Sequence, residues 1–161
     1  MPSTIRLATL PDIPALIELM RDFYAEANYA LDAVWATTAF TGLLQDANHG
    51  LVWIAWEGAA PVGYVVLTFR YSMEFGGIDG FIDDLSVRAA HRRKGFATQL
   101  LSALFEECER RGVLAVHVET SSANLPATAL YRRWGLEDRQ RLLLTKKLTS
   151  RRETSLVAPE E

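Results

Sequence analysis

The sequence predicts an α+β fold, in which strands and helices alternate along one domain. Two apolar, β-branched runs at residues 51–56 and 62–69 are joined by five residues, a connection of hairpin length. A later segment, 96–111, repeats apolar residues at helical spacing. With 161 residues, of which 49% are hydrophobic, the chain can bury the core of one domain and hardly more.

The N-terminal third predicts one strand followed by two helices. Residues 4–8 have the pattern of a strand, and Leu10, Pro11 and Asp12 open a helix. Apolar residues then recur on one face of that helix, at Ile13, Leu16, Ile17 and Met20. A second helix is predicted from about Thr37 to Gln45, before a turn that ends at Gly50.

The middle of the chain predicts three strands and a long helix. After the hairpin, a glycine-containing loop from Tyr71 to Gly80 leads into a strand from Phe81 to Val87. The helix from Phe96 to Arg111 presents one apolar face, so this face is expected to pack on the sheet. Gly112 ends the helix as a C-terminal cap.

The C-terminal third predicts a strand, a short helix and a last strand. The strand covers Leu114 to Glu119, and the helix runs from Pro126 to Trp134 and stops at Gly135. Residues Arg141 to Lys147 are predicted to close the sheet as its last strand. We therefore expect a single domain over residues 1–148 and a polar, flexible tail over residues 149–161.

Composition excludes several classes of protein. There is no apolar run long enough to span a membrane and no secretory signal, so a cytoplasmic protein without a membrane partner is expected. The formal charge of −3 argues against a nucleic-acid partner. The three histidines show no ligand spacing, which predicts no metal site. The single cysteine, Cys108, lies on the apolar helical face and is expected to be a buried packing residue.

The segment from Phe81 to Thr98 carries the strongest functional signal. An apolar strand runs directly into a basic loop, and the loop has the form R-x-x-G-x-A from Arg92 to Ala97 at the start of a helix. Gly95 lets successive backbone N–H groups turn toward one anion, and the helix adds its unpaired N–H groups and the positive end of its dipole. The loop therefore predicts a phosphate-binding site.

A second motif lies at the next predicted junction of strand and helix. Asn124, Ala127, Leu130, Tyr131 and Gly135 form the pattern N-x-x-A-x-x-L-Y-x-x-x-G. Together with L-x-V at Leu85 to Val87 and the loop that follows, this pattern resembles the GCN5-related N-acetyltransferase (GNAT) superfamily over roughly residues 5–148. Departures from the family are Ala89, where proline is frequent, Ala97, where a second glycine is frequent, and Leu136, where phenylalanine is common.

The resemblance implies a mixed, mostly antiparallel sheet flanked by helices, with splayed central strands. It also implies acetyl-CoA as acyl donor, with pantetheine along the strand at Leu85, Ser86 and Val87 and a backbone N–H near the thioester oxygen. The other positions that it implies for cofactor binding are Arg92, Arg93, Lys94, Gly95, Phe96, Ala97, Thr98, Asn124 and Tyr131. A solvated basic loop and simple helix capping by Asn124 are the structural alternatives.

Transfer of an acyl group to an amine needs a proton acceptor and a proton donor. The resemblance assigns Asp83 as the base, acting directly or through water, and Tyr131 as the acid. Strict alternation puts Asp83 and Asp84 on opposite faces, so only one should face the site. A loop-bracing pair of acids and a core tyrosine are the structural alternatives.

The acceptor region is predicted from the family's architecture as the first two helices and the loop after the third strand. Its aromatic and acidic residues suit a small basic amine, and they include Tyr24, Tyr29, Asp32, Tyr71 and Glu74. Bracing of loops or a homodimer contact would explain these residues equally well. A protein lysine or N-terminus as acceptor, and an acyl-CoA-binding sensor without turnover, also stay open. P-loop and Rossmann sites are excluded because their glycine motifs are missing.

Overall fold

The computed structural model describes residues 2–148, so the predicted tail at 149–161 lies outside the described residues. The elements in chain order are β1 (Ser3–Leu7), α1 (Ile13–Glu26), α2 (Ala33–Leu44), β2 (Gly50–Glu57), β3 (Ala60–Ser72), β4 (Gly77–Val87), α3 (Phe96–Arg111), β5 (Val116–Val118) and α4 (Leu125–Arg133). Two short 3-10 turns, η1 (Leu10–Asp12) and η2 (Ala89–His91), precede α1 and α3. The predicted α+β class is confirmed.

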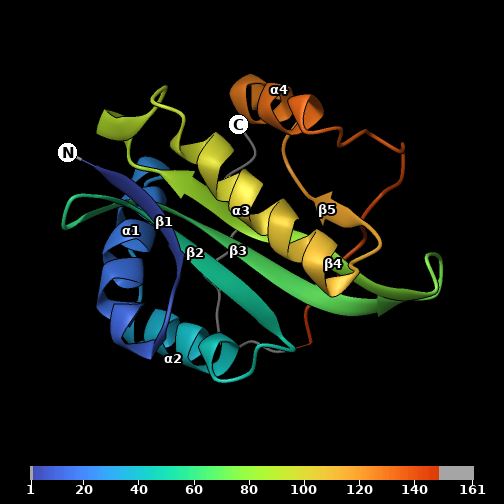
Figure 1. Cartoon of the computed structure of the whole chain (residues 1–161), viewed down its shortest axis with the longest axis horizontal. Coiled ribbons are helices and arrows are strands. Elements are labelled where there is room, and N and C mark those ends of the chain that lie inside the picture. The colour runs from blue at the N-terminus through green and yellow to red at the C-terminus, as the bar shows by residue number, and fades with distance from the viewer. Residues whose placement is uncertain (1, 149–161) are drawn as a thin grey trace.

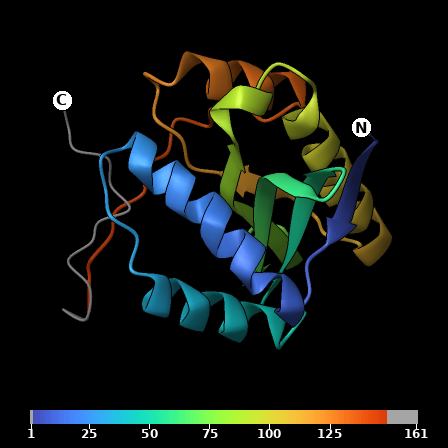
Figure 2. The ribbon, with the colours of Figure 1, turned by 90° about the vertical axis from the view of Figure 1, so that its left-hand side faces the viewer.

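The five strands form one sheet in the order β1-β2-β3-β4-β5. The first four strands are antiparallel to their neighbours, and β5 runs parallel to β4. Helices α1 and α2 cover one face of this sheet, and α3 with α4 lies on the other (Figures 1 and 2).

Alternation along the strands explains the two apolar cores on either side of the sheet. In β2, Trp53 and Ala55 pack on the α3 side, whereas Val52 and Ile54 pack on the side of α1 and α2. Both faces are covered by helices, so these strands are apolar throughout rather than alternating in polarity.

Two predicted boundaries differ from the structure. Helix α2 begins at Ala33 instead of near Thr37, because the Asp32 side chain accepts the backbone N–H of Trp35 at 3.1 Å and caps the helix. Most of the predicted loop before Phe81 belongs to β3 and β4. Gly80 marks close packing, because a Cβ there would lie 2.8 Å from Leu67 Cδ1.

The predicted last strand, Arg141 to Lys147, is wrong. Residues 136–148 form no helix or strand, and the side chains of Leu142 and Leu144 are 89% and 86% exposed. Strand β5, predicted over Leu114 to Glu119, has only three residues and so offers a short edge for pairing. Arg141 instead donates to Glu74 on the β3–β4 connection. An apolar run flanked by charges satisfies the strand pattern, but it becomes a strand only with a partner.

Candidate functional site

Strands β4 and β5, the last pair at one edge of the sheet, separate partway along β4. They pair only from Gly80 with Val116 to Ile82 with Val118, while β4 continues to Val87 (Figure 1). A bulge at this point leaves Asp83 without a partner on β3, where Ile82 pairs with Leu67 and Asp84 with Val66. Among the described residues, no strand pairs with the β5-facing edge of β4 beyond Ile82. Beyond Ile82 the two strands diverge, and we call this opening between β4 and β5 the fork. It leaves backbone groups able to bind an extended ligand.

The loop between β4 and α3 has the geometry of an anion-binding nest. Arg93 and Gly95 both adopt left-handed conformations, with φ of 62° and 87°, directly before the N-terminus of α3. A Cβ on Gly95 would meet only Gln99 Nε2, at 3.8 Å. The backbone conformation rather than lack of space therefore explains this glycine. Arg93 and Lys94 are exposed beside the nest.

Arg92 and Arg88 bind α1 and so are already engaged. The Arg92 guanidinium donates from Nη2 to both Glu26 carboxylate oxygens at 2.5 and 2.7 Å, and from Nε to the carbonyl of Val87 at 3.0 Å. Arg88 contacts two further acids of α1, at 2.5 and 3.1 Å, which are Glu18 and Asp22. These ion pairs fix the loop against α1, and the cations left beside the nest are Arg93 and Lys94.

Of the two adjacent carboxylates on β4, Asp84 has the more distinctive environment. Asp83 is exposed at the bulge, but the nearby protein partly desolvates its carboxylate and so raises its pKa. Asp84 is half-buried on the face of α1 and α2, and the Tyr64 hydroxyl donates to its Oδ2 at 3.4 Å. Desolvation and the charge of Asp83 raise the pKa of Asp84 to about 7. Asp84 can therefore accept or release a proton near neutral pH.

Tyr131 lies on α4, buried at 8% exposure among the residues of the α3-side core. Desolvation and the charge of Asp84 raise the pKa of the Tyr131 phenol to about 12. The phenol is thus protonated at neutral pH and can donate. Asn124 caps α4, since its Oδ1 accepts the N–H of Ala127 at 3.2 Å. This contact bears out the capping alternative, and its predicted ligand contact stays a prediction.

The predicted acceptor residues are only partly brought together. Tyr24 is buried at 5% exposure, and Tyr29 packs beside it in the core of α1 and α2. Asp32 caps α2. Tyr71 is 66% exposed and alternates with Arg70 along β3, so it points to the opposite face. Glu74 is bound by two arginines at 3.0 Å, Arg139 and Arg141.

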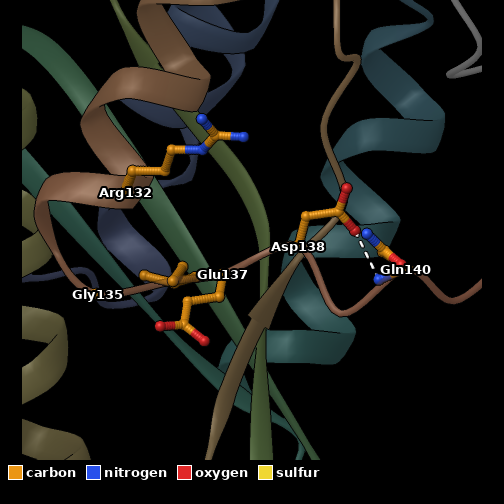
Figure 3. A pocket seen from close by; sticks show the side chains of 6 residues that line it. Arg132, Gly135, Glu137, Asp138 and Gln140 are labelled. Carbon is orange, nitrogen blue, oxygen red and sulfur yellow. Dashed lines mark hydrogen bonds between the residues drawn. The ribbon is translucent and has the colours of Figure 1, made fainter.

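A polar hollow of about 440 Å³ follows the end of α4 (Figure 3). It is lined by Arg132, Gly135, Leu136, Glu137, Asp138 and Gln140. The Asp138 carboxylate accepts the backbone N–H of Gln140 at 2.7 Å, which fixes one wall. The sequence motif includes Gly135, but no pattern in the sequence predicted a hollow here. Neither Asp84 nor Tyr131 lines the hollow, so it is separate from the fork between β4 and β5.

Two residues of interest were missed from the sequence. Tyr64 sits in an apolar strand and gives no pattern of its own, yet it is fully buried and holds Asp84. His117 was considered only as a metal ligand, but its ring bonds a buried carboxylate, Asp79, at 2.8 Å. Spacing finds neither contact, because both join residues from different strands.

Two classes of feature are missing from residues 2–148. No cluster of three or more His, Cys, Asp or Glu side chains is arranged to hold a metal ion in this range. Within the same residues, no helix combines the length and apolar character that a membrane span requires.

Comparisons with known proteins agree with this geometry. The acetyltransferase (GNAT) family model matches residues 13–136. The chain is similar to the uncharacterized N-acetyltransferase YsnE of Bacillus subtilis (strain 168), with 34% identity over 108 residues that cover 60% of this chain and 68% of the relative.

Solved structures extend the likeness over almost the whole chain. The integron cassette protein HFX_CASS3, from the mobile metagenome of Cole Harbour Salt Marsh, is 40% identical with a TM-score of 0.83 over 90% of each chain. AAC(6')-Iy, in complex with the bisubstrate analog CoA-S-monomethyl-acetylneamine, is 19% identical with a TM-score of 0.79. That match covers 91% of this chain and 99% of the other, and it shows a shared fold.

Proposed function

From its membership of the acetyltransferase (GNAT) family, which makes the chain an acyl-CoA-dependent acetyltransferase, we propose that it acetylates the primary amine of a small molecule. The amine attacks acetyl-CoA directly, in a complex that holds both substrates. The observation that carries this proposal is the fork between β4 and β5, with a protonated phenol and a carboxylate of pKa about 7 beside an anion nest.

Acetyl-CoA binding is proposed along the open edge of β4. The pyrophosphate would accept hydrogen bonds from backbone N–H groups of the nest and the first turn of α3, from Arg93 to Thr98. Pantetheine would pair with the backbone of Leu85 to Val87, as an added strand does. A backbone N–H near Leu85 or Ser86 would then face the thioester oxygen.

The proposed reaction balances with one base and one acid. Loss of a proton from the ammonium to a carboxylate, directly or through water, frees the nitrogen lone pair. The nitrogen then forms a bond to the acetyl carbon, and the C–S bond breaks as the tetrahedral intermediate collapses. Tyr131 gives its proton to the departing thiolate, and the Tyr131 phenolate takes up the second proton of the attacking nitrogen, directly or through water. These transfers leave the neutral amide and coenzyme A.

We propose Asp84 as the principal base, with Asp83 as the alternative base. A base works best when its pKa is near the working pH, and the raised pKa of Asp84 meets that condition. The charge of Asp84 also acts on Tyr131, which supports a common site for these two groups. Asp83 stands at the bulge, where water can relay a proton.

A small amine as acceptor is supported by the bound analog of AAC(6')-Iy, which pairs coenzyme A with acetylneamine in one molecule. A protein lysine or N-terminus is the second class of acceptor. We also propose a cytoplasmic location and a possible homodimer. A sensor that binds acetyl-CoA without turnover would have no use for a matched acid and base.

A thiol-release screen with acetyl-CoA tests the proposal. The panel contains small primary amines, a lysine-containing peptide, peptides with a free N-terminus, and alcohols. Release that depends on a small amine, with the acetamide identified by mass spectrometry, is the expected outcome. Acetyl-CoA binding without release to any acceptor would support the sensor instead, and release only with peptides would establish the protein acetyltransferase.

A further inference from the structure

A buried carboxylate on β4 holds a histidine on the neighbouring strand. Asp79 has no exposed surface, and Arg70 on β3 donates to it from Nε at 2.9 and 3.1 Å and from Nη2 at 2.9 Å. The His117 ring on β5 meets Asp79 Oδ2 through Nε2 at 2.8 Å. Neither the chemistry at the fork nor the binding of acetyl-CoA uses this cluster.

The contacts of Asp79 fix the hydrogen-bonding role of His117. Burial alone would raise the pKa of Asp79, but the hydrogen bonds from Arg70 and His117 outweigh it, so the pKa lies below its usual value. An ionised carboxylate only accepts, so His117 Nε2 carries the hydrogen. An imidazole that carries its one hydrogen on Nε2 presents Nδ1 as an acceptor. The side chain is 25% exposed, which leaves part of the ring accessible.

The position of His117 places this acceptor on the same side of the sheet as Asp84. His117 pairs in register with Phe81, and alternation with the bulge at Asp83 puts Phe81 and Asp84 on one face. Three residues of strand separate Phe81 from Asp84, a distance of about 10 Å. The ring of His117 lies 4.8 Å from that of Phe81 and 5.9 Å from that of Phe75.

Charges around His117 disfavour a second ammonium group. The guanidinium of Arg70 stands 4.8 Å from the centre of the Phe81 ring, and that of Arg139 stands 5.9 Å from the Phe75 ring. Asp79 is neutralised by Arg70, and Glu74 is shared by two arginines, Arg139 and Arg141. The aromatic faces and carboxylates that could attract a cation are thus already occupied.

We infer that His117 Nδ1 binds a neutral hydrogen-bond donor, a hydroxyl or amide N–H, that the acceptor substrate carries about 10 Å from its reacting amine. Asp79 orients the ring through its contact with Nε2. The inference rests on the proposed amine acetylation and narrows it to amines with a remote hydroxyl or amide. Within the expected small basic amines, it favours those without a second ammonium group at this distance.

A matched series of acceptors tests this without any mutation. Linear primary amines of one length, spanning about 10 Å, would end in methyl, hydroxyl, carboxamide, ammonium or carboxylate groups. The hydroxyl and carboxamide compounds should exceed the methyl compound by about tenfold in kcat/KM. Equal values for all end groups, or a preference for ammonium or carboxylate, would overturn the inference while leaving amine acetylation intact. No release with any amine would overturn both.

Variants of His117 then assign the preference to its ring. In His117→Phe, the kcat/KM values of the hydroxyl and methyl compounds should become equal, while the KM for acetyl-CoA stays at its wild-type value. His117→Gln retains an acceptor oxygen and should recover part of the preference. His49, an exposed histidine on the α2–β2 turn, provides the control variant His49→Phe. A preference that survives both His117 variants would contradict the assignment.

Discussion

Two carboxylates on one face of β4, Asp79 and Asp84, show how neighbouring positions are put to different use. Asp79 lies next to the segment of β4 that pairs with β5 and has two partners, Arg70 and His117, which hold its pKa below the usual value. Asp84 lies beyond the fork, where it accepts a hydrogen bond from the uncharged Tyr64 hydroxyl, and desolvation and the charge of Asp83 raise its pKa to about 7. A buried acid with a cation stabilises the fold, whereas one without a cation can exchange protons.

The largest effect is expected for Tyr131→Phe, which removes the proposed proton donor beside the unpaired part of β4. Loss of the proton donor should lower kcat by roughly 10²-fold and leave the acetyl-CoA affinity unchanged. Steady-state kinetics and a thermal midpoint are measured on the same protein. If Tyr131 is only a core residue, the midpoint falls and kcat is retained.

A second pair, the two glycines that flank α3, sharpens the contrast between a functional and a structural position. Gly95 and Gly112 are both left-handed, with φ of 87° and 71°, but only Gly95 adjoins the nest. Valine at either position should strain the backbone by a similar amount, about 1–3 kcal/mol. Calorimetry should show acetyl-CoA affinity reduced at least about tenfold in Gly95→Val and unchanged in Gly112→Val. Equal affinities in the two variants would show that the nest does not bind acetyl-CoA.

The variants Asp79→Asn and Asp84→Asn should change the stability of the protein in opposite directions. Asp79→Asn leaves Arg70 without its counter-charge, and because Arg70 stays half-exposed we expect a loss of about 2 kcal/mol. Asp84→Asn removes a carboxylate that binds its proton more tightly when folded, so wild-type stability falls as pH rises from about 4 to 7. The Asp84→Asn protein should therefore melt higher than wild type above pH 7, and the difference should vanish near pH 4. If thermal melts show that Asp84→Asn melts lower than wild type above pH 7, or that Asp79→Asn melts higher, the contrast between the two carboxylates is wrong.

The smallest effect is expected for Arg92→Ala. Its guanidinium binds Glu26 and the Val87 carbonyl, so we expect it to stabilise the loop more than to bind the phosphates. The KM for acetyl-CoA should rise only a few-fold, and Glu26→Gln should produce a similar change. A much larger effect of Arg92→Ala than of Glu26→Gln would show direct contact with the cofactor.

Much of the fold could be predicted because local signals agree with the packing. Helix α3 has the predicted bounds, since an apolar face lies between two glycines that start and end it. The last strand failed because strand formation depends on a partner, and the three-residue β5 leaves residues 141–147 unpaired. The loop before Phe81 was misread because its glycines serve close packing as well as turns.

The candidate site could also be predicted only in part. The nest and Tyr131 follow from motifs that are contiguous in sequence. The orientation of Asp83 and Asp84 depends on a bulge against β3, which strict alternation cannot foresee. The cluster of Arg70, Asp79 and His117 joins three strands, so no spacing along the chain reveals it.

The pH dependence of kcat/KM for wild type, Asp84→Asn and Asp83→Asn tests the central claim most directly. With Asp84 as base, the wild-type value should rise through pH 7, in line with its pKa of about 7, and Asp83→Asn should keep that rise. Asp84→Asn should lose it, with activity reduced roughly 10²-fold and recovering only at high pH, where the amine itself is neutral. A wild-type profile in Asp84→Asn, together with its loss in Asp83→Asn, would contradict the account.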